Sequence, residues 1–219
     1  AMNISGKNAN FSEAGRGNWL VEQTNAFETD RIDAHVTITN QKIFKFKKQI
    51  SVHLYLGTSH SLGRAHIIYD KKNPNKKEQY IRLKLEKPIF CINGDPFILQ
   101  DKSASCVVGG GKVVDPLAED FKFIDAHITY LKTLRLDNHL DALQNLLKIS
   151  ETGLSLSKFR SIRNLKKEET NLLLGKIQGR SEEIIIFQDK IEETIFTQKN
   201  WELFLELIIQ KIKFRHHQF

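Results

Sequence analysis

The sequence predicts a small closed antiparallel β-barrel followed by a winged helix-turn-helix and a C-terminal amphipathic helix. Three observations lead to this fold class: short runs of alternating apolar and polar residues fill positions 32–116, turn-forming residues separate the runs, and after Pro116 the apolar spacing lengthens to three and four residues. A period of two is typical of half-buried strands, and a period near 3.6 of helices. About six short strands in succession predict a barrel.

The strands are indicated most clearly by three runs. Apolar residues occupy every second position at 32–38, 50–56 and 81–85. Further short runs at 88–99 and 106–116 complete the set. The segment 70–77 between two of the runs is rich in Asn and Lys, which predicts a solvated hairpin connection.

Three consecutive glycines, Gly109, Gly110 and Gly111, lie inside the last run. Glycine is required where φ is positive or where another chain approaches the backbone closely. Within a strand pattern the glycines predict a bulge, a barrel corner or a surface that docks a bulky partner. The Gly-Gly-Gly-Lys sequence is not a phosphate loop, because that motif needs glycine at Cys106 and Ser or Thr at Val113.

Beyond Pro116 the spacing predicts helices within 121–134, 137–147, 155–163 and 166–177, with Asp137 as the cap of the second. A strand pair around 178–180 and 184–187 is predicted as the wing. Thr197 is predicted to cap a last helix, whose apolar face either begins a further module or packs back on the preceding one. That face contains Trp201, Phe204, Leu205, Ile208, Ile209 and Ile212.

Four segments are therefore expected. Residues 1–24 are a remnant of a preceding β-barrel domain, or alternatively a flexible tail; 25–116 are the barrel; 117–196 are the winged helix; and 197–219 are a helix that opens the next winged-helix module. Ala1-Met2 resembles a cloning scar, so the chain is expected to be a piece of a longer protein.

Composition favours a polyanionic partner. There are 33 basic and 26 acidic residues, for a net charge of +7, which suits nucleic acid or the ribosome, although solubility alone can explain a basic surface. Cys91 and Cys106 lack metal-ligand spacing and indicate a reduced, cytoplasmic protein. No apolar run approaches the roughly 18 residues that a membrane span needs.

The sequence does not predict an enzyme or a metal site. His53, His60 and His66 fall on neighbouring predicted strands, and no Cys or carboxylate is placed to complete four ligands. Neither cysteine has the sequence context of a nucleophile.

Two surfaces are candidates for binding. On the barrel, Tyr55, Arg64, Arg82, Lys84 and the glycine run offer a ring, cations and backbone amides, which suit a phosphate–sugar backbone; alternatively, the strand cations merely form a solvated face. In the helical part a cationic cluster lies where winged helices contact nucleic acid. Alternatively, such folds serve as spacers or as protein contacts, and nearby glutamates reduce the positive charge of this cluster. The cluster comprises Lys158, Arg160, Arg163, Lys166, Lys167 and Arg180.

The barrel segment resembles the third domain of the bacterial selenocysteine-specific elongation factors. The resemblance rests on five stretches in order: Leu54–Thr58, Leu62–Arg64, Leu83–Pro88, Gly94–Leu99 and Gly109–Pro116. It extends weakly upstream to Arg16–Leu20, which is similar to the end of the second domain of that family. A winged helix directly after the Asp-Pro pair is also what the family shows.

The resemblance implies part of a GTP-dependent factor that delivers selenocysteyl-tRNA to the ribosome at UGA codons. It further implies that the barrel contacts the T-stem of the tRNA and that the first winged helix acts as a connector. GTP, Mg²⁺ and the mRNA hairpin would be bound by domains outside this chain, so no cofactor is expected here, and the chain is expected to be a monomer. The implied tRNA-binding residues are Tyr55, Arg64, Arg82, Lys84, Gln100, Asp101, Gly109, Gly110, Gly111 and Lys112.

The sequence departs from the family at two positions. Arginine is common in the family where Gln100 and Cys106 stand, so two cations of the tRNA face are lacking, whereas Arg64 and Lys112 match cationic positions. Three alternatives remain: another tRNA-delivering GTPase, a winged-helix DNA-binding transcriptional regulator, and a protein-interaction module.

Overall fold

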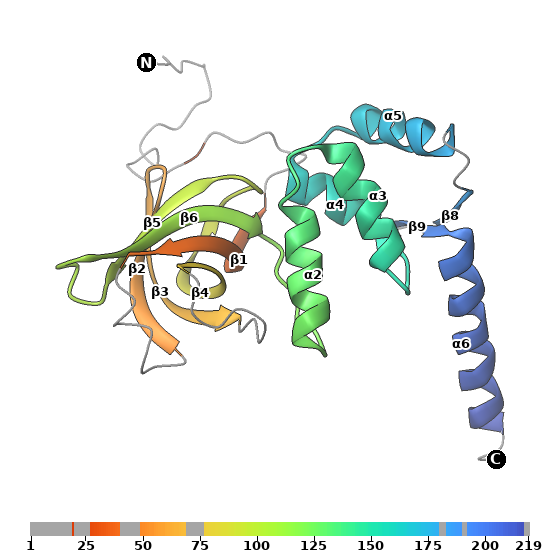
Figure 1. Cartoon of the computed structure of the whole chain (residues 1–219), viewed down its shortest axis with the longest axis horizontal. Helices are drawn as coiled ribbons and strands as arrows, with labels where there is room; N and C mark the ends of the chain where they lie inside the picture. The colour runs from red at the N-terminus through yellow and green to blue at the C-terminus, as the bar shows by residue number, and fades with distance from the viewer. Residues whose placement is uncertain are drawn as a thin grey trace, which may run out of the picture.

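The computed structural model describes residues 19, 27–39, 49–68, 77–179, 183–189 and 192–216. Figure 1 shows a barrel beside a group of helices, with the last helix extending away from both. Several expectations lie outside the described residues: the fold of 1–24 apart from Trp19, most of the connection 70–77, and the position of Arg180.

The barrel is closed and antiparallel, as predicted. Its strands are β1 (Glu28–Ile38), β2 (Gln49–Leu56), β3 (Ser59–Ile68), β4 (Glu78–Phe90), β5 (Pro96–Asp101) and β6 (Val107–Asp115). Around the barrel they follow the order β1-β4-β3-β2-β5-β6, and β1 pairs with β6 to close it. In this order β2 lies across the barrel from β1, and β5 lies across from β4.

The alternating residues form the barrel core. Ile32, Val36, Val52 and Leu83 are fully buried, and their neighbours in each strand point outward. Burial in this core raises the pKa of the Cys91 thiol to about 12, so the thiol stays protonated at neutral pH.

Trp19 packs against the barrel. Its ring lies against the core, and its indole N–H donates to the Ser59 hydroxyl over 2.7 Å. The same ring covers Gly57, which has a φ of +55° in the β2–β3 turn; a Cβ there would lie 2.8 Å from the ring. A side chain at Gly57 would therefore displace the tryptophan.

The glycine run serves close packing between strands. A Cβ on Gly109 would lie 2.7 Å from the Thr37 carbonyl oxygen of β1, and one on Gly111 would overlap the His35 carbonyl oxygen of the same strand. A Cβ on Gly110 would meet only the Phe97 carbonyl oxygen, at 3.2 Å. The structure supports two of the predicted reasons for this run: the close approach of another strand, and a bulge beside the run, where the register between β5 and β6 shifts between Leu99 and Gln100.

We expect the substitution Gly111→Ala to destabilise the barrel by about 1–3 kcal/mol, the usual cost of overpacking. The new methyl group meets the β1 backbone, which cannot rotate away as a side chain could. Chemical denaturation measures the loss. Gly110→Ala is the matched control and should cost clearly less; equal losses would contradict the explanation.

The helical part begins directly after the barrel. It comprises α2 (Ile124–Leu134), α3 (His139–Ile149), β7 (Leu154–Ser155), α4 (Leu156–Arg163), α5 (Lys167–Gln178), β8 (Ile184–Gln188), β9 (Glu193–Thr197) and α6 (Gln198–His216). Its three strands form a sheet in the order β7-β9-β8. The succession from α3 to β9 is compatible with the predicted winged helix-turn-helix.

Details of the helical part differ from the prediction. The cap of α3 is Asn138, whose side chain accepts from the Leu140 amide, and not Asp137. The wing pairs 184–188 with 193–197, whereas 178–180 was predicted as its first strand. Gln178 instead ends α5, because the helical spacing of buried residues continues to Ile177.

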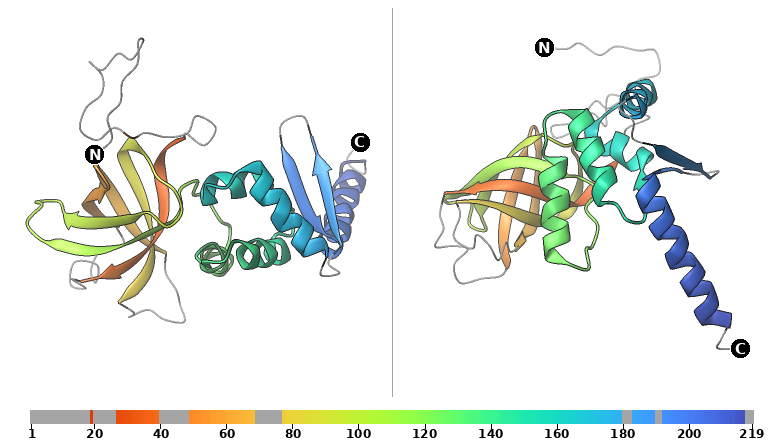
Figure 2. Two further views of the ribbon diagram at one scale, coloured as in Figure 1. Left: turned by 90° about the horizontal axis from the view of Figure 1, so that it is seen from above. Right: turned by 45° about the vertical axis from the view of Figure 1, so that its right-hand side comes forward.

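The last helix begins where the sequence predicts. The Thr197 hydroxyl accepts from the Asn200 amide at the start of α6, and Figure 2 shows the β8–β9 hairpin beside this helix. Phe196 of β9 packs edge-on against Trp201. Farther along, α6 exposes Ile209, Ile212 and Phe214. Among the described residues, no helix combines the length and apolar character of a membrane span.

The two parts share one core. Ile68, Tyr80 and Val114 of the barrel belong to the same buried cluster as Leu131 of α2 and Phe159 of α4. The helices therefore pack against the outer wall of the barrel where β3, β4 and β6 contribute these residues.

Candidate nucleic-acid interface

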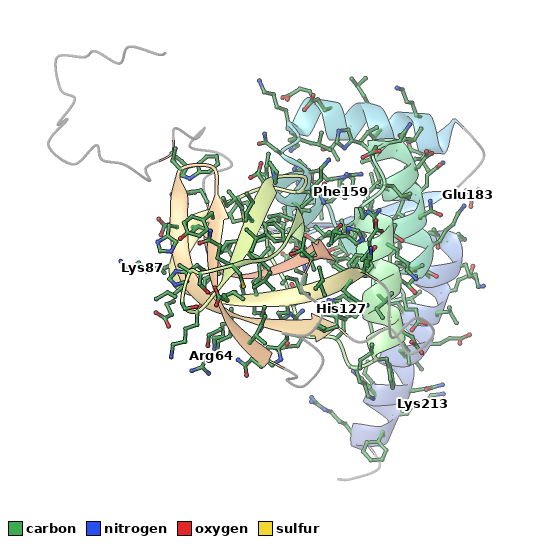
Figure 3. All side chains as sticks on the ribbon, turned by 60° about the vertical axis from the view of Figure 1, so that its left-hand side comes forward. Arg64, Lys87, His127, Phe159, Glu183 and Lys213 are labelled. Atoms are coloured by element: carbon green, nitrogen blue, oxygen red, sulfur yellow. The ribbon has the colours of Figure 1, made fainter. Side chains whose placement is uncertain are left out.

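The predicted tRNA-binding residues do not form one continuous surface. Arg82 lies in the junction between the barrel and the helices, whereas Tyr55 and Gln100 lie on β2 and β5, across the barrel. Figure 3 shows Arg64 and Lys87 on the side away from the helices and His127 between the two parts.

Arg82 is held by a carboxylate inside the junction. Its Nε and one terminal nitrogen donate to the two oxygens of Asp33 at 2.7 and 2.8 Å, and its other terminal nitrogen donates to Asp120 at 2.7 Å. The Asp33 side chain is fully buried. The hydrogen bonds to Asp33 are the main reason that the pKa of Arg82 is raised. Arg82 thus has a structural role, and its contact with tRNA stays a prediction.

His127 completes this junction from α2. Its Nε2 lies 2.6 Å from an oxygen of Asp33. The buried carboxylate of Asp33 therefore contacts both Arg82 of β4 and His127 of α2. The Phe121 ring stacks on the imidazole with the ring centres 4.4 Å apart. Asp33 and His127 cannot be recognised from sequence alone, because an acid at an outward strand position looks solvated until its partner, 94 residues away, is known.

A second contact crosses the junction nearby. Arg163 of α4 donates to the Asn93 side chain at 3.2 Å and to the Leu136 carbonyl at 2.6 Å. The Asn93 amide in turn donates to the Val114 carbonyl at 2.7 Å. Burial lowers the pKa of Arg163. This cation therefore joins the two parts of the molecule instead of facing a ligand.

Arg64 and Lys84 do come together. They are directly paired across β3 and β4, and both are exposed. Arg31 of β1 follows Lys84 in the same row, but it is bound to Asp120 at 3.1 Å and to the Ala118 carbonyl at 2.8 Å. Within the described chain Arg64 and Lys84 have no ion-pair partner, so this pair can meet a phosphate.

Tyr55 belongs to a column of three rings. His60 lies between Tyr55 and His53, with ring-centre distances of 4.7 and 5.1 Å. The Nδ1 atom of His53 is 2.8 Å from the Nε2 atom of His60. Ile98, directly opposite Tyr55 on β5, is 51% exposed. The structure thus places two of the histidines considered as metal ligands in a ring stack; no group of three potential ligands occurs among the described residues.

Asp101 organises the β5–β6 turn. Its carboxylate accepts from the hydroxyl of Ser103 and from the backbone amides of Ser105 and Cys106. These bonds, the Ser103 hydroxyl first, hold the pKa of Asp101 well below its usual range. Asp101 therefore remains ionised and shapes the turn, while Gln100 precedes it on β5, opposite His53.

The glycine run forms part of the barrel wall. Gly109, Gly110 and Gly111 pair with β1 on one side and with β5 on the other. The backbone of the run therefore lies within the sheet, and we do not regard it as an exposed amide surface. Lys112, the next residue, is exposed.

The cations of the helical part are largely paired with acids. Lys158 lies 2.9 Å from Glu119, and Arg160 lies 3.0 Å from Glu193. Lys167 also approaches Glu193, at 3.6 Å. These ion pairs leave less positive charge for nucleic acid than the sequence suggests.

Comparison with known proteins defines the class of the barrel. Residues 29–120 match the family model described as selenocysteine-specific elongation factor, beta-barrel domain. This part of the chain is similar to a domain of translation elongation factors. Within that class, it is similar to the β-barrel domain of the selenocysteine-specific elongation factors.

Two relatives agree with this assignment. A selenocysteine-specific elongation factor of Haemophilus influenzae is 24% identical over 100 residues, which cover 46% of this chain and 16% of that protein. The crystal structure of bacterial selenocysteine-specific elongation factor EF-Sec matches 87% of this chain and 27% of its own, with a TM-score of 0.55 and 18% identity. The chain thus spans a small part of each relative, and the structural match shows the fold.

Proposed function

We propose that this chain is the part of a GTP-dependent elongation factor in which a barrel contacts the T-stem of selenocysteyl-tRNA and a helical domain acts as a connector. The match of residues 29–120 to the elongation factor barrel carries this proposal. Delivery to the ribosome at UGA codons, in the cytoplasm, and recognition of the mRNA hairpin would require further domains of the longer protein.

The charges support a contact with the RNA backbone on the barrel. Arg64 and Lys84 are adjacent, exposed and unpaired within the described chain, and Lys112 is also exposed. Such cations bind phosphate with little sequence selection. No comparison supports the DNA-binding alternative, and the ion pairs of Lys158 and Arg160 argue against it.

The test is a salt titration of binding to an acceptor–T-arm minihelix of selenocysteine tRNA, with an ordinary tRNA arm and a DNA duplex as competitors. We expect log affinity to fall linearly with log salt concentration. The double substitution Arg64→Glu, Lys84→Glu should weaken binding roughly 10- to 100-fold and reduce the salt slope by about one to two, since each lost phosphate contact removes about one.

Lys213→Glu provides the matched control, because Lys213 lies toward the far end of α6 (Figure 3) and should leave the affinity within about twofold. If the DNA duplex competes as well as the RNA arm, or if the double variant binds like the control, the proposal is wrong.

A further inference from the structure

The ring column on β2 and β3 has a hydrogen-bond pattern that fixes its protons. The Nε2 atom of His53 lies 3.1 Å from the Lys102 carbonyl oxygen. A carbonyl oxygen only accepts, so this nitrogen must carry a hydrogen. In the neutral ring the Nδ1 atom of His53 is then an acceptor, and the 2.8 Å contact requires the Nε2 atom of His60 to be the donor.

The other assignment of the protons fails. If the Nδ1 atom of His53 donated to His60, the neutral His53 ring would turn a bare Nε2 toward the Lys102 carbonyl, and two acceptors would face each other at 3.1 Å. The free position of the pair is therefore the Nδ1 atom of His60, for which the described part of the chain provides no partner.

This pattern limits the intact pair to one added proton. A proton on the Nδ1 atom of His60 leaves its bond to His53 in place and makes it charge-assisted, which strengthens it. A second proton, on the Nδ1 atom of His53, would set two N–H groups against each other across 2.8 Å. The geometry of the intact pair therefore has room for one added proton and not for two.

The surroundings of His60 favour a positive charge on its ring and the binding of an anion beside it. The Tyr55 ring lies 4.7 Å from the His60 ring in a stacked arrangement, which stabilises an adjacent cation. Lys102 is exposed at the neighbouring turn, and Lys87, whose backbone contacts Ser61 beside His60, is exposed as well. The Asp101 carboxylate is occupied by the donors of its own turn.

We propose that the His53–His60 pair is a proton-dependent phosphate site, at which an RNA backbone contacts the Nδ1 atom of His60 and binds with uptake of one proton. This inference rests on the proposed function, because it specifies how the barrel contacts RNA on the wall opposite the helices. Histidine is the side chain that changes charge between pH 5 and 8, so the site adds a cation to the barrel as the pH falls.

The experiment is calorimetric titration of the chain with the same minihelix from pH 5.5 to 8.5 at constant salt, in buffers of different ionisation enthalpy. The wild type should take up as much as one proton per RNA, and its affinity should rise by at most about tenfold per pH unit as the pH falls. His60→Gln should abolish this uptake. His66→Gln, which changes an exposed histidine of the same strand, should retain it.

The outcomes separate the two proposals. RNA binding whose proton uptake is unchanged by His60→Gln overturns the phosphate site but leaves the proposed function intact, whereas absence of RNA binding at every pH overturns both. Nitrogen-15 NMR of the imidazoles in the free protein adds a test without RNA. We expect the neutral pair to take up at most one further proton, at the Nδ1 atom of His60, and the Nδ1 atom of His53 to stay unprotonated; independent uptake of two protons would refute the assignment.

Discussion

The substitution Asp33→Asn should destabilise the protein by about 3–5 kcal/mol, the usual cost of removing one partner from a buried ion pair. Asp33 is fully buried and accepts from Arg82 at 2.7 Å. Asparagine has a similar shape, but it removes the negative charge and turns an N–H group toward the remaining donors. The cation of Arg82 would then stay in the junction without its main counter-charge.

Chemical denaturation measures this loss, and Asp120→Asn is its control. Asp120 contacts the same arginine at 2.7 Å, but its side chain is 81% exposed. Exposed ion pairs contribute roughly 0–1 kcal/mol. Equal effects of the two substitutions would show that burial of Asp33 does not determine its contribution.

Phe159→Ala should cost a similar amount, about 3–5 kcal/mol, because it leaves a cavity in a packed core. Phe159 of α4 is 1% exposed and belongs to the core shared by helices and barrel. Leu172→Ala on α5 removes a side chain that is 68% exposed and should change stability by less than about 0.5 kcal/mol. A loss below about 1 kcal/mol for Phe159→Ala would contradict its packing role.

The two tryptophans allow each part to be followed separately. Trp19 lies against the barrel core, and Trp201 packs on Phe196 in the helical part; the chain has 2 tryptophans in all. In Phe159→Ala we expect the Trp201 fluorescence to change at lower denaturant than that of Trp19. Replacing one tryptophan at a time with Phe assigns each transition.

Local pattern was sufficient to predict most of the barrel strands and most of the helices. A strand with one buried face has a period of two, which is visible from Ile32 to Ile38 without any knowledge of its partners. The second wing strand was missed for the opposite reason. Glu193–Thr197 is short, follows polar residues and is defined by its pairing with β7 and β8, which no local pattern reveals.

The candidate site was only partly predictable, because exposure of an outward side chain depends on contacts with distant parts of the chain. Tyr55, Arg64 and Lys84 were identified by residue type and lie exposed on the barrel. Arg82 is an arginine like Arg64 and points outward from β4 like Lys84. Residues from α2 and from the loop before it nevertheless surround Arg82. Which outward position faces water and which faces a neighbouring domain depends on long-range packing.

The shared core also bears on how such barrels can be exchanged between related factors. The sequence changes from strands to helices at Pro116, but Ile68, Tyr80 and Val114 on one side of that point are buried with Leu131 and Phe159 on the other. A chimera joined at Pro116 would pair two surfaces that have not been selected for each other. A functional exchange would have to transfer α2 to α4 together with the barrel, so the structural unit that can be moved is larger than the barrel itself.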